Sequence, residues 1–323
     1  MLCLVLAVRT AEAGTVESRS IDSAALGAPI DVRVYVPSTG ATIGPLPVVY
    51  LLHGFGGGAG DWLGGGGAKA TADRVFAMPD AVPMLLVMPG VGNSWYVDSE
   101  KHGAWERALI DDLIPAIERI YPVRRERGQR FVAGLSMGGY GALRLAVHHP
   151  RVFGAAAAFS PAVFEDVRSA AEFPDFQLRF FAGAFGEPLD PALFNAANIF
   201  APLDTIPPTL ETGFYVMTGD HDGLGLWDGA LRFFRAARAA GHPVELRVHD
   251  GDHEWRLWRE ELEPALRWFA TRSRGADGGC QWARPRSSSS VSASDQSSPI
   301  ASMTSSRSAE RMAASAASIG MMP

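Results

Sequence analysis

The chain has 323 residues, of which 47% are hydrophobic, enough to build a substantial core in one large domain or two small ones. Its formal net charge is −6, and no basic stripe interleaved with aromatic residues runs along it, so its composition argues against a nucleic-acid partner. Cys3 and Cys280 are the two cysteines, one near each end, which argues against a disulfide framework and against a cysteine-based metal site.

The two ends of the chain differ in composition from the rest. Residues 1–8 are apolar and "AEA" precedes a glycine, so 1–14 is predicted to be a signal peptide or a disordered N-terminus. Residues 273–323 hold 15 serines and no hydrophobic period, which predicts a disordered tail. One domain is therefore expected at 15–272. Secretion or a periplasmic location is favoured, with a cytoplasmic location as the alternative.

Within 15–272, short apolar runs alternate with helical patterns. The first run, 31–37, alternates polar with apolar residues and predicts a half-buried strand. The later runs are continuously apolar, which is typical of strands buried on both faces. Strands are expected at 31–37, 47–54, 84–90, 130–134, 154–160, 214–219 and 244–250, and helices at 103–120, 138–148, 226–240 and 255–271. This alternation predicts an α/β fold with a mostly parallel central sheet covered by helices on both faces, and a site at the carboxyl ends of its strands.

The segment "GLSMG" around Ser136 has the form G-x-S-x-G and lies directly between a predicted strand and a predicted helix. In that context the serine occupies a sharp turn at the start of the helix, where its hydroxyl is exposed for nucleophilic attack. Gly134 and Gly138 fit this turn because a tight strand-to-helix connection leaves no room for a Cβ atom beside it. The alternative is a Gly-rich turn in which Ser136 is an ordinary N-cap.

A nucleophilic serine needs a base, and the base needs an orienting acid. In this arrangement both partners follow the serine along the chain, with the acid first. His253, in the loop after the last predicted strand, is favoured as the base. His249 is expected to lie still within that strand and to have a structural role.

Two aspartates follow the predicted strand at 214–219. Asp222 lies three residues past the end of that strand and is favoured as the acid, whereas Asp220 adjoins the strand end and could brace the turn instead. Asp250 and Asp252 stand too close to the candidate base in sequence to reach its far nitrogen easily. They are expected to be solvated or to form turns.

Acyl transfer also requires hydrogen-bond donors for the oxyanion. One expected donor is the backbone N–H of Met137, next to the nucleophile. The second is expected from the Gly-rich loop after the strand 47–54, with Phe55 favoured over Gly56. His53 is interpreted as structural, and "GGGG" at 64–67 as a flexible loop, because it lacks the Lys-Ser/Thr of a phosphate-binding loop.

A further loop, 89–103, leaves another strand end. It carries Asn93, Ser94, Trp95 and Tyr96, which are expected to line a pocket for the acyl or alcohol part of a substrate. The alternative for its aromatic residues is simple packing.

Four sequence blocks, "LLHGFGG…DW", "GNSWYVDS", "GLSMGGYGAL" and "GDHEWRLWREELEPAL", resemble the esterase D family of α/β-hydrolases, and they occur in the order of that family. The family includes tributyrin-type esterases, S-formylglutathione hydrolases, bacterial feruloyl esterases and relatives of the mycolyltransferases. The resemblance covers about residues 20–272 and implies the α/β-hydrolase fold.

By this resemblance Ser136 is the nucleophile, Asp222 the acid and His253 the base. The positions of Phe55 and Met137 correspond to those whose backbone N–H groups bind the oxyanion.

The chain departs from the family pattern in two places. The family usually has a bulky residue after its aspartate, whereas Gly223 follows Asp222, so Asp220 stays open as the acid. The segment 161–210 matches only loosely, and it is expected to cover the site and to influence substrate choice.

The sequence thus predicts a serine carboxylesterase that hydrolyses short-chain acyl esters through an acyl-enzyme, without a metal or another cofactor. The same chemistry on S-formylglutathione, feruloyl esters or acetylated polysaccharide is the alternative, and a non-catalytic binding protein of the same fold is another. The expected partner is a small acyl ester, with neither a nucleic acid nor a membrane span, and a homo-oligomer stays open.

Overall fold

The computed structural model describes residues 13–38, 44–181 and 183–278. The predicted N-terminal segment lies almost entirely outside these residues, as does most of the predicted Ser-rich tail. The strands are β1 (Thr15–Ser23), β2 (Ala28–Val36), β3 (Val48–Leu52), β4 (Leu85–Pro89), β5 (Asp98–Ser99), β6 (Gly103–Ala104), β7 (Arg130–Leu135), β8 (Ala155–Phe159), β9 (Gly213–Gly219) and β10 (Val244–His249). The α-helices are α1 (Asp61–Gly64), α2 (Ala68–Phe76), α3 (Trp105–Arg107), α4 (Ile114–Ile120), α5 (Met137–His148), α6 (Asp175–Phe181), α7 (Pro191–Ala196), α8 (Leu226–Ala239) and α9 (Trp255–Gly278).

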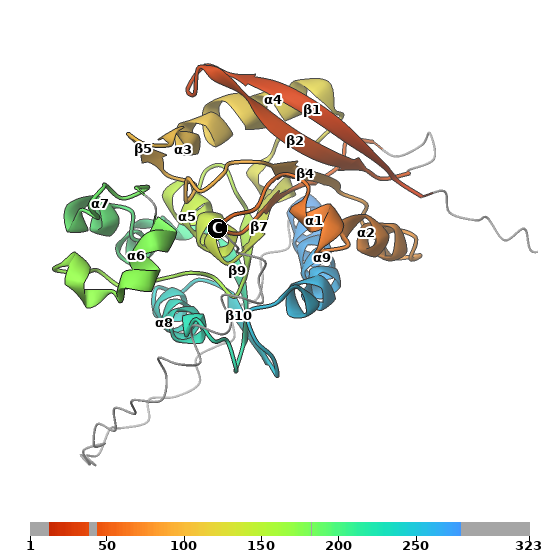
Figure 1. Cartoon of the computed structure of the whole chain (residues 1–323). Coiled ribbons are helices and arrows are strands. Elements are labelled where there is room, and N and C mark those ends of the chain that lie inside the picture. Colours follow the sequence, from red (N-terminus) through yellow and green to blue (C-terminus); the bar gives the residue numbers. More distant parts are fainter. Residues whose placement is uncertain (1–12, 39–43, 182, 279–323) are drawn as a thin grey trace, which may run out of the picture.

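Eight of the strands form one sheet in the order β1-β2-β4-β3-β7-β8-β9-β10 (Figure 1). The six strands from β4 to β10 in this order are parallel to one another, whereas β2 is antiparallel to both β1 and β4. The mostly parallel central sheet is therefore confirmed. The sequence did not predict β1, because most of its residues are exposed or half-buried and it shows no regular apolar alternation.

Two apolar clusters cover the two faces of this sheet. Within β3, Val48 and Tyr50 belong to one cluster and Val49 and Leu51 to the other, as the alternation of side chains along a strand requires. Helices α4, α5 and α8 contribute to the first cluster, and α1, α2 and α9 to the second (Figure 1). A strand buried on both faces needs apolar residues at every position, which explains the continuous apolar runs of the sequence. The prediction was wrong for β10, whose residues are all half-buried or exposed because it lies at the edge of the sheet.

The helix expected at 103–120 is interrupted. It begins as α3, passes through a π-helical stretch at Ala108–Leu113 and continues as α4. Pro115, in the first turn of α4, has no backbone N–H to donate to the preceding turn, which accounts for the irregular hydrogen bonding there.

Two further boundaries differ from expectation. The glycines at 64–67 end α1 and lead into α2, so they separate two helices that the sequence did not predict. At the other end of the domain, α9 continues beyond residue 272 to Gly278. Ser273 is buried there, and its Oγ donates a hydrogen bond to Gln129 Oε1 at 2.6 Å, which ties the helix end to the turn directly before β7.

The segment 161–210, inserted between β8 and β9, carries α6 and α7. Its core is a group of phenylalanine rings with centroids 4.9–6.4 Å apart: Phe164, Phe173, Phe181, Phe185 and Phe194. Phe180 of α6 lies edge-on to Phe55 at 5.3 Å, so the insertion lies against the loop after β3. Across the described residues, none of the helices combines the length and the apolar character that crossing a membrane requires.

Candidate active site

Ser136 occupies the turn between β7 and α5. Its backbone has φ 53° and ψ −118°, a strained conformation that is rare for residues other than glycine. Its N–H donates to Phe159 O at 2.9 Å and its carbonyl accepts from Ala162 N at 3.0 Å, so the end of β8 holds the strained turn in place.

The glycines on either side of Ser136 permit this turn. A Cβ atom on Gly134 would lie 2.2 Å from the carbonyl oxygen of Gly138, and one on Gly138 would lie 2.4 Å from the carbonyl oxygen of Leu52. Both clashes involve backbone atoms, which cannot swing away as a side chain can. The strained turn therefore depends on glycine at both positions.

His253 and Asp222 form a buried pair. His253 Nδ1 lies 2.8 Å from Asp222 Oδ2, and the two side chains are 2% and 0% exposed. The other carboxylate oxygen of Asp222 accepts from Leu224 N at 2.9 Å. Because a carboxylate accepts hydrogen bonds, the pairing places the imidazole proton on Nδ1 and leaves Nε2 as an acceptor.

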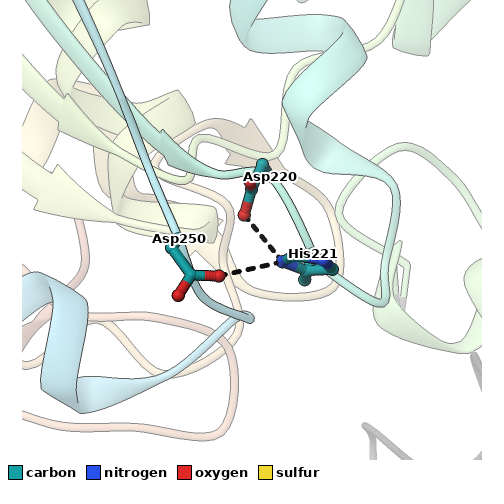
Figure 2. A group of neighbouring side chains, drawn as sticks. All are labelled: Asp220, His221 and Asp250. Carbon is teal, nitrogen blue, oxygen red and sulfur yellow. Dashed lines mark ion pairs between the residues drawn. The ribbon is translucent and has the colours of Figure 1, made fainter.

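Asp220, the other candidate for the acid, lies in a different place. Its Oδ1 accepts from Gly251 N at 3.2 Å and lies 2.8 Å from His221 Nδ1. The hydrogen bond from Gly251 and the positive charge of a protonated His221 lower the pKa of Asp220. Figure 2 shows His221 between Asp220 and Asp250, whose Oδ1 is 3.3 Å from the ring. The structure therefore places Asp222, and not Asp220, against His253.

The group in Figure 2 is also the one cluster of the described residues that could hold a metal ion, with ligand atoms within 4.8 Å of one another. Its three side chains are exposed and come from the ends of β9 and β10. The contacts within the group join these two strand ends on the outside of the molecule.

Asp252 joins the same two loops close to the buried pair. Its Oδ1 accepts hydrogen bonds of 2.7 Å from the backbone N–H of Gly223 and from that of His253. Through this one carboxylate oxygen, Asp252 joins the loop that carries Asp222 to the backbone of His253. The sequence suggested only a solvated or turn-forming role for this residue.

The loop after β3 carries the candidate oxyanion donors. Phe55 and Met137 both line the cavity that contains Ser136 and His253. The N–H of Gly56, the alternative donor, already donates to Asn93 Oδ1 at 2.7 Å. This hydrogen bond favours Phe55 over Gly56 as the second donor.

His53 and His249, which the sequence assigned structural roles, both contact other groups within the fold. His53 Nδ1 lies 2.7 Å from Gly54 O, and its Nε2 accepts from Val91 N at 3.0 Å, so both ring nitrogens are engaged. Burial lowers the pKa of His53, which keeps the ring neutral. His249 is the last residue of β10, and its Nε2 lies 2.7 Å from Glu261 Oε2.

Of the four residues expected in the pocket, Trp95 lines the cavity, whereas Asn93, Ser94 and Tyr96 hold the loop behind it. Asn93 binds the loop after β3, as described above. Ser94 Oγ accepts from Tyr96 N at 3.2 Å, and Tyr96 OH donates to His53 O at 2.8 Å. The pocket prediction is thus corrected for these three, because they are not among the residues that line the cavity and their hydrogen bonds hold the loop within the fold.

The cavity beside Ser136 and His253 has a volume of about 160 Å³. Its walls include residues that sequence reasoning did not assign to the site: Asp61 from α1, Phe176, Gln177, Phe180 and Phe181 from α6, and Trp255 and Trp258 from α9. Trp258 Nε1 donates to Ser160 Oγ at 3.2 Å, and its ring lies edge-on to His253 at 4.9 Å. The two tryptophans closely following His253 in "HEWRLW" are a sequence signal that could have indicated this wall.

Comparison with known proteins agrees with this architecture. A model of the putative esterase family matches residues 23–269. An acetyl esterase of Caldicellulosiruptor saccharolyticus is 26% identical over 70% of this chain and 84% of its own length. An endo-1,4-beta-xylanase/feruloyl esterase of Xylanibacter ruminicola is 35% identical over 67% of this chain, a region that spans 25% of that longer protein.

Solved structures show the same fold. A ferulic acid esterase superposes with a TM-score of 0.68 at 26% identity, covering 80% of this chain and 99% of its own. An S-formylglutathione hydrolase from Agrobacterium tumefaciens superposes with a TM-score of 0.65 at 21% identity, covering 81% and 97%. The chain therefore belongs to the putative esterase family, an esterase D-like family with the α/β-hydrolase fold, and is a carboxylesterase.

Proposed function

We propose that this carboxylesterase hydrolyses short-chain acyl esters with Ser136 as nucleophile, His253 as base and Asp222 as acid. The observation that carries the proposal is the buried 2.8 Å pair of His253 Nδ1 and Asp222 Oδ2, which borders the same cavity as the strained turn of Ser136. A base oriented through Nδ1 presents Nε2 to the cavity, as proton abstraction from a serine requires.

The proposed reaction proceeds in two steps. Ser136 Oγ attacks the ester carbonyl while His253 Nε2 takes the serine proton, and the resulting oxyanion accepts hydrogen bonds from the N–H groups of Phe55 and Met137. His253 then gives the proton to the departing alcohol, which leaves an acyl-enzyme. A water molecule, activated in turn by His253, hydrolyses the acyl-enzyme and restores the serine.

The dimensions of the cavity support a short acyl chain. Its volume of about 160 Å³ is smaller than the roughly 300–1,000 Å³ of sites that bury drug-sized ligands. A second candidate substrate, an aromatic acyl ester such as a feruloyl ester, is favoured by the phenylalanine and tryptophan rings in the walls, which suit stacking with an aryl group.

The test is the hydrolysis of p-nitrophenyl acetate and p-nitrophenyl butyrate by the full chain and by Ser136→Ala. We expect the substitution to lower kcat by about 10⁴-fold or more. Ser18→Ala is the matched control, because Ser18 is exposed on β1, outside the cavity. A fluorophosphonate probe is expected to label the wild type and Ser18→Ala but not Ser136→Ala.

Two results would contradict the proposal. Equal turnover by wild type and Ser136→Ala would exclude Ser136 as the nucleophile, and folded wild type that neither reacts with the probe nor hydrolyses any ester would indicate a binding protein. Methyl ferulate and S-formylglutathione, assayed beside the p-nitrophenyl esters, decide the substrate class by their kcat/KM values.

A further inference from the structure

One acidic side chain, Asp61, lines the otherwise mainly apolar cavity beside Ser136. Among the described residues that line it, Asp61 is the one carboxylate, and neither a lysine nor an arginine is present. The other walls are mainly aromatic and aliphatic. The electrostatic character of the cavity therefore depends on Asp61 and on the protonation of His253.

Asp61 lines the same cavity as Ser136 and His253. Asp61 is the first residue of α1, and a Cβ atom on Gly57 would lie 2.0 Å from Asp61 Oδ2, so the carboxylate rests on the loop that carries Phe55. The next residue, Trp62, lies edge-on to Trp255 at 5.8 Å, which places α1 beside the start of α9 (Figure 1).

The carboxylate of Asp61 is not neutralised by a cationic partner from the part of the chain that the structure describes. Neither an ion pair nor a side-chain hydrogen bond engages its carboxylate among the residues that the structure describes. By contrast, Asp73 on the neighbouring α2 pairs with Lys69 at 2.6 Å. A half-buried carboxylate that faces an apolar cavity is costly unless a polar or cationic group reaches it.

We propose that Asp61 makes this esterase select its substrates by charge, favouring esters with a positively charged group and disfavouring anionic ones. A carboxylate in a cavity lined by aromatic rings combines the two features that attract organic cations, direct charge attraction and the negative faces of the rings. The inference rests on the proposed function, because it assumes that the ester binds in the cavity beside Ser136.

The test compares wild type with Asp61→Asn, which removes the charge and preserves the shape. One set of substrates varies the alcohol half: phenyl acetate and its 3-trimethylammonio and 3-carboxy derivatives. A second set varies the acyl half: p-nitrophenyl butyrate and its 4-trimethylammonio and 4-carboxy derivatives. Asp22→Asn is the matched control, because it removes the same charge from an exposed position on β1.

We expect Asp61→Asn to lower the ratio of kcat/KM for the cationic ester to that for the anionic ester by about tenfold in at least one set. The kcat/KM for the neutral ester should change by a factor between those of the cationic and the anionic ester, and Asp22→Asn should leave all ratios unchanged. The set that responds identifies the half of the substrate that faces α1. Independently of turnover of a charged ester, the inhibition constant of phenyltrimethylammonium should rise about fivefold in Asp61→Asn.

Unchanged ratios in both sets, or an equal loss for all three esters of a set, would overturn the inference and leave Asp61 with a purely structural role. Failure of the proposed function is a different result. In that case the wild type would hydrolyse none of the neutral esters, or Ser136→Ala would hydrolyse them equally well.

Discussion

Replacing Asp222 with asparagine tests the buried pair most directly. The hydrogen bond from Leu224 N to Oδ1 requires an acceptor at that position, so the amide oxygen of the asparagine should remain there. The amide nitrogen must then face His253 Nδ1, to which it can only donate. The imidazole is forced to carry its proton on Nε2, the nitrogen that must accept the proton of Ser136.

The wrong tautomer should lower kcat strongly because the pair is buried. With the two side chains 0% and 2% exposed, water cannot stabilise the alternative arrangement. We expect kcat at neutral pH to fall by about 10³–10⁴-fold, which corresponds to about 4–5.5 kcal/mol of lost transition-state stabilisation. KM should change little, because Asp222 Oδ2 faces the imidazole ring.

The measurement is the steady-state hydrolysis of p-nitrophenyl butyrate by Asp222→Asn and by its matched control Asp220→Asn. The control removes a carboxylate two residues away, on the exposed side of the loop, and should retain activity within about threefold. Thermal unfolding of both variants establishes that they are folded. The reasoning is refuted if Asp222→Asn retains more than about a tenth of the wild-type kcat, or if Asp220→Asn loses as much.

Two further predictions concern residues around the site. Asp252→Ala should lower kcat about tenfold with little effect on KM, because Gly223 and His253 both lose a backbone hydrogen bond. Asp252→Asn, which keeps an acceptor oxygen, should recover most of the rate, and equal losses in the two variants would contradict a positioning role. Burial tends to raise the pKa of Glu106, but the hydrogen bond from His149 and the charge of Arg144 outweigh it and lower the pKa to about 2. Ionised Glu106 therefore stabilises the fold above pH 4.5, and this contribution is lost as the pH falls through about 2. Relative to wild type, Glu106→Gln should lose about 3 kcal/mol of unfolding free energy at pH 7 and less at pH 3, measured by urea denaturation, and an equal loss at both pH values would refute it.

The core of the fold could be predicted because burial leaves a local signature. Strands β3, β4, β7, β8 and β9 are buried at every position, and apolar runs mark them in the sequence. Strand β1 has no such signature, because only two of its nine residues are buried and hydrogen bonds to β2 hold it in the sheet. Helices α1 and α2 were missed because glycines at 64–67 separate them, and glycine is a poor helix former.

Ser136 could be predicted for a different reason. A Cβ atom on Gly134 would clash with the backbone of Gly138, only four residues away, so the G-x-S-x-G pattern can be recognised from the local sequence. The choice between Asp220 and Asp222 is not local. Both follow the same strand end, and which of them faces His253 depends on how the loop after β9 meets the loop after β10, a contact between segments about thirty residues apart.

The proposed chemistry and the choice of substrate depend on different parts of the fold. Ser136, Asp222 and His253 follow three parallel strands, β7, β9 and β10, whose ends are fixed by the sheet and its core. The walls of the cavity come instead from α1, from the inserted α6 and from the start of α9, which lie outside the sheet. Substitutions in these walls can change which ester fits while the strand ends keep their geometry. This is consistent with a segment at 161–210 that matches the family loosely in a chain whose strand-end motifs match it closely, and we expect residues of that segment that line the cavity, such as Phe180, to influence substrate choice.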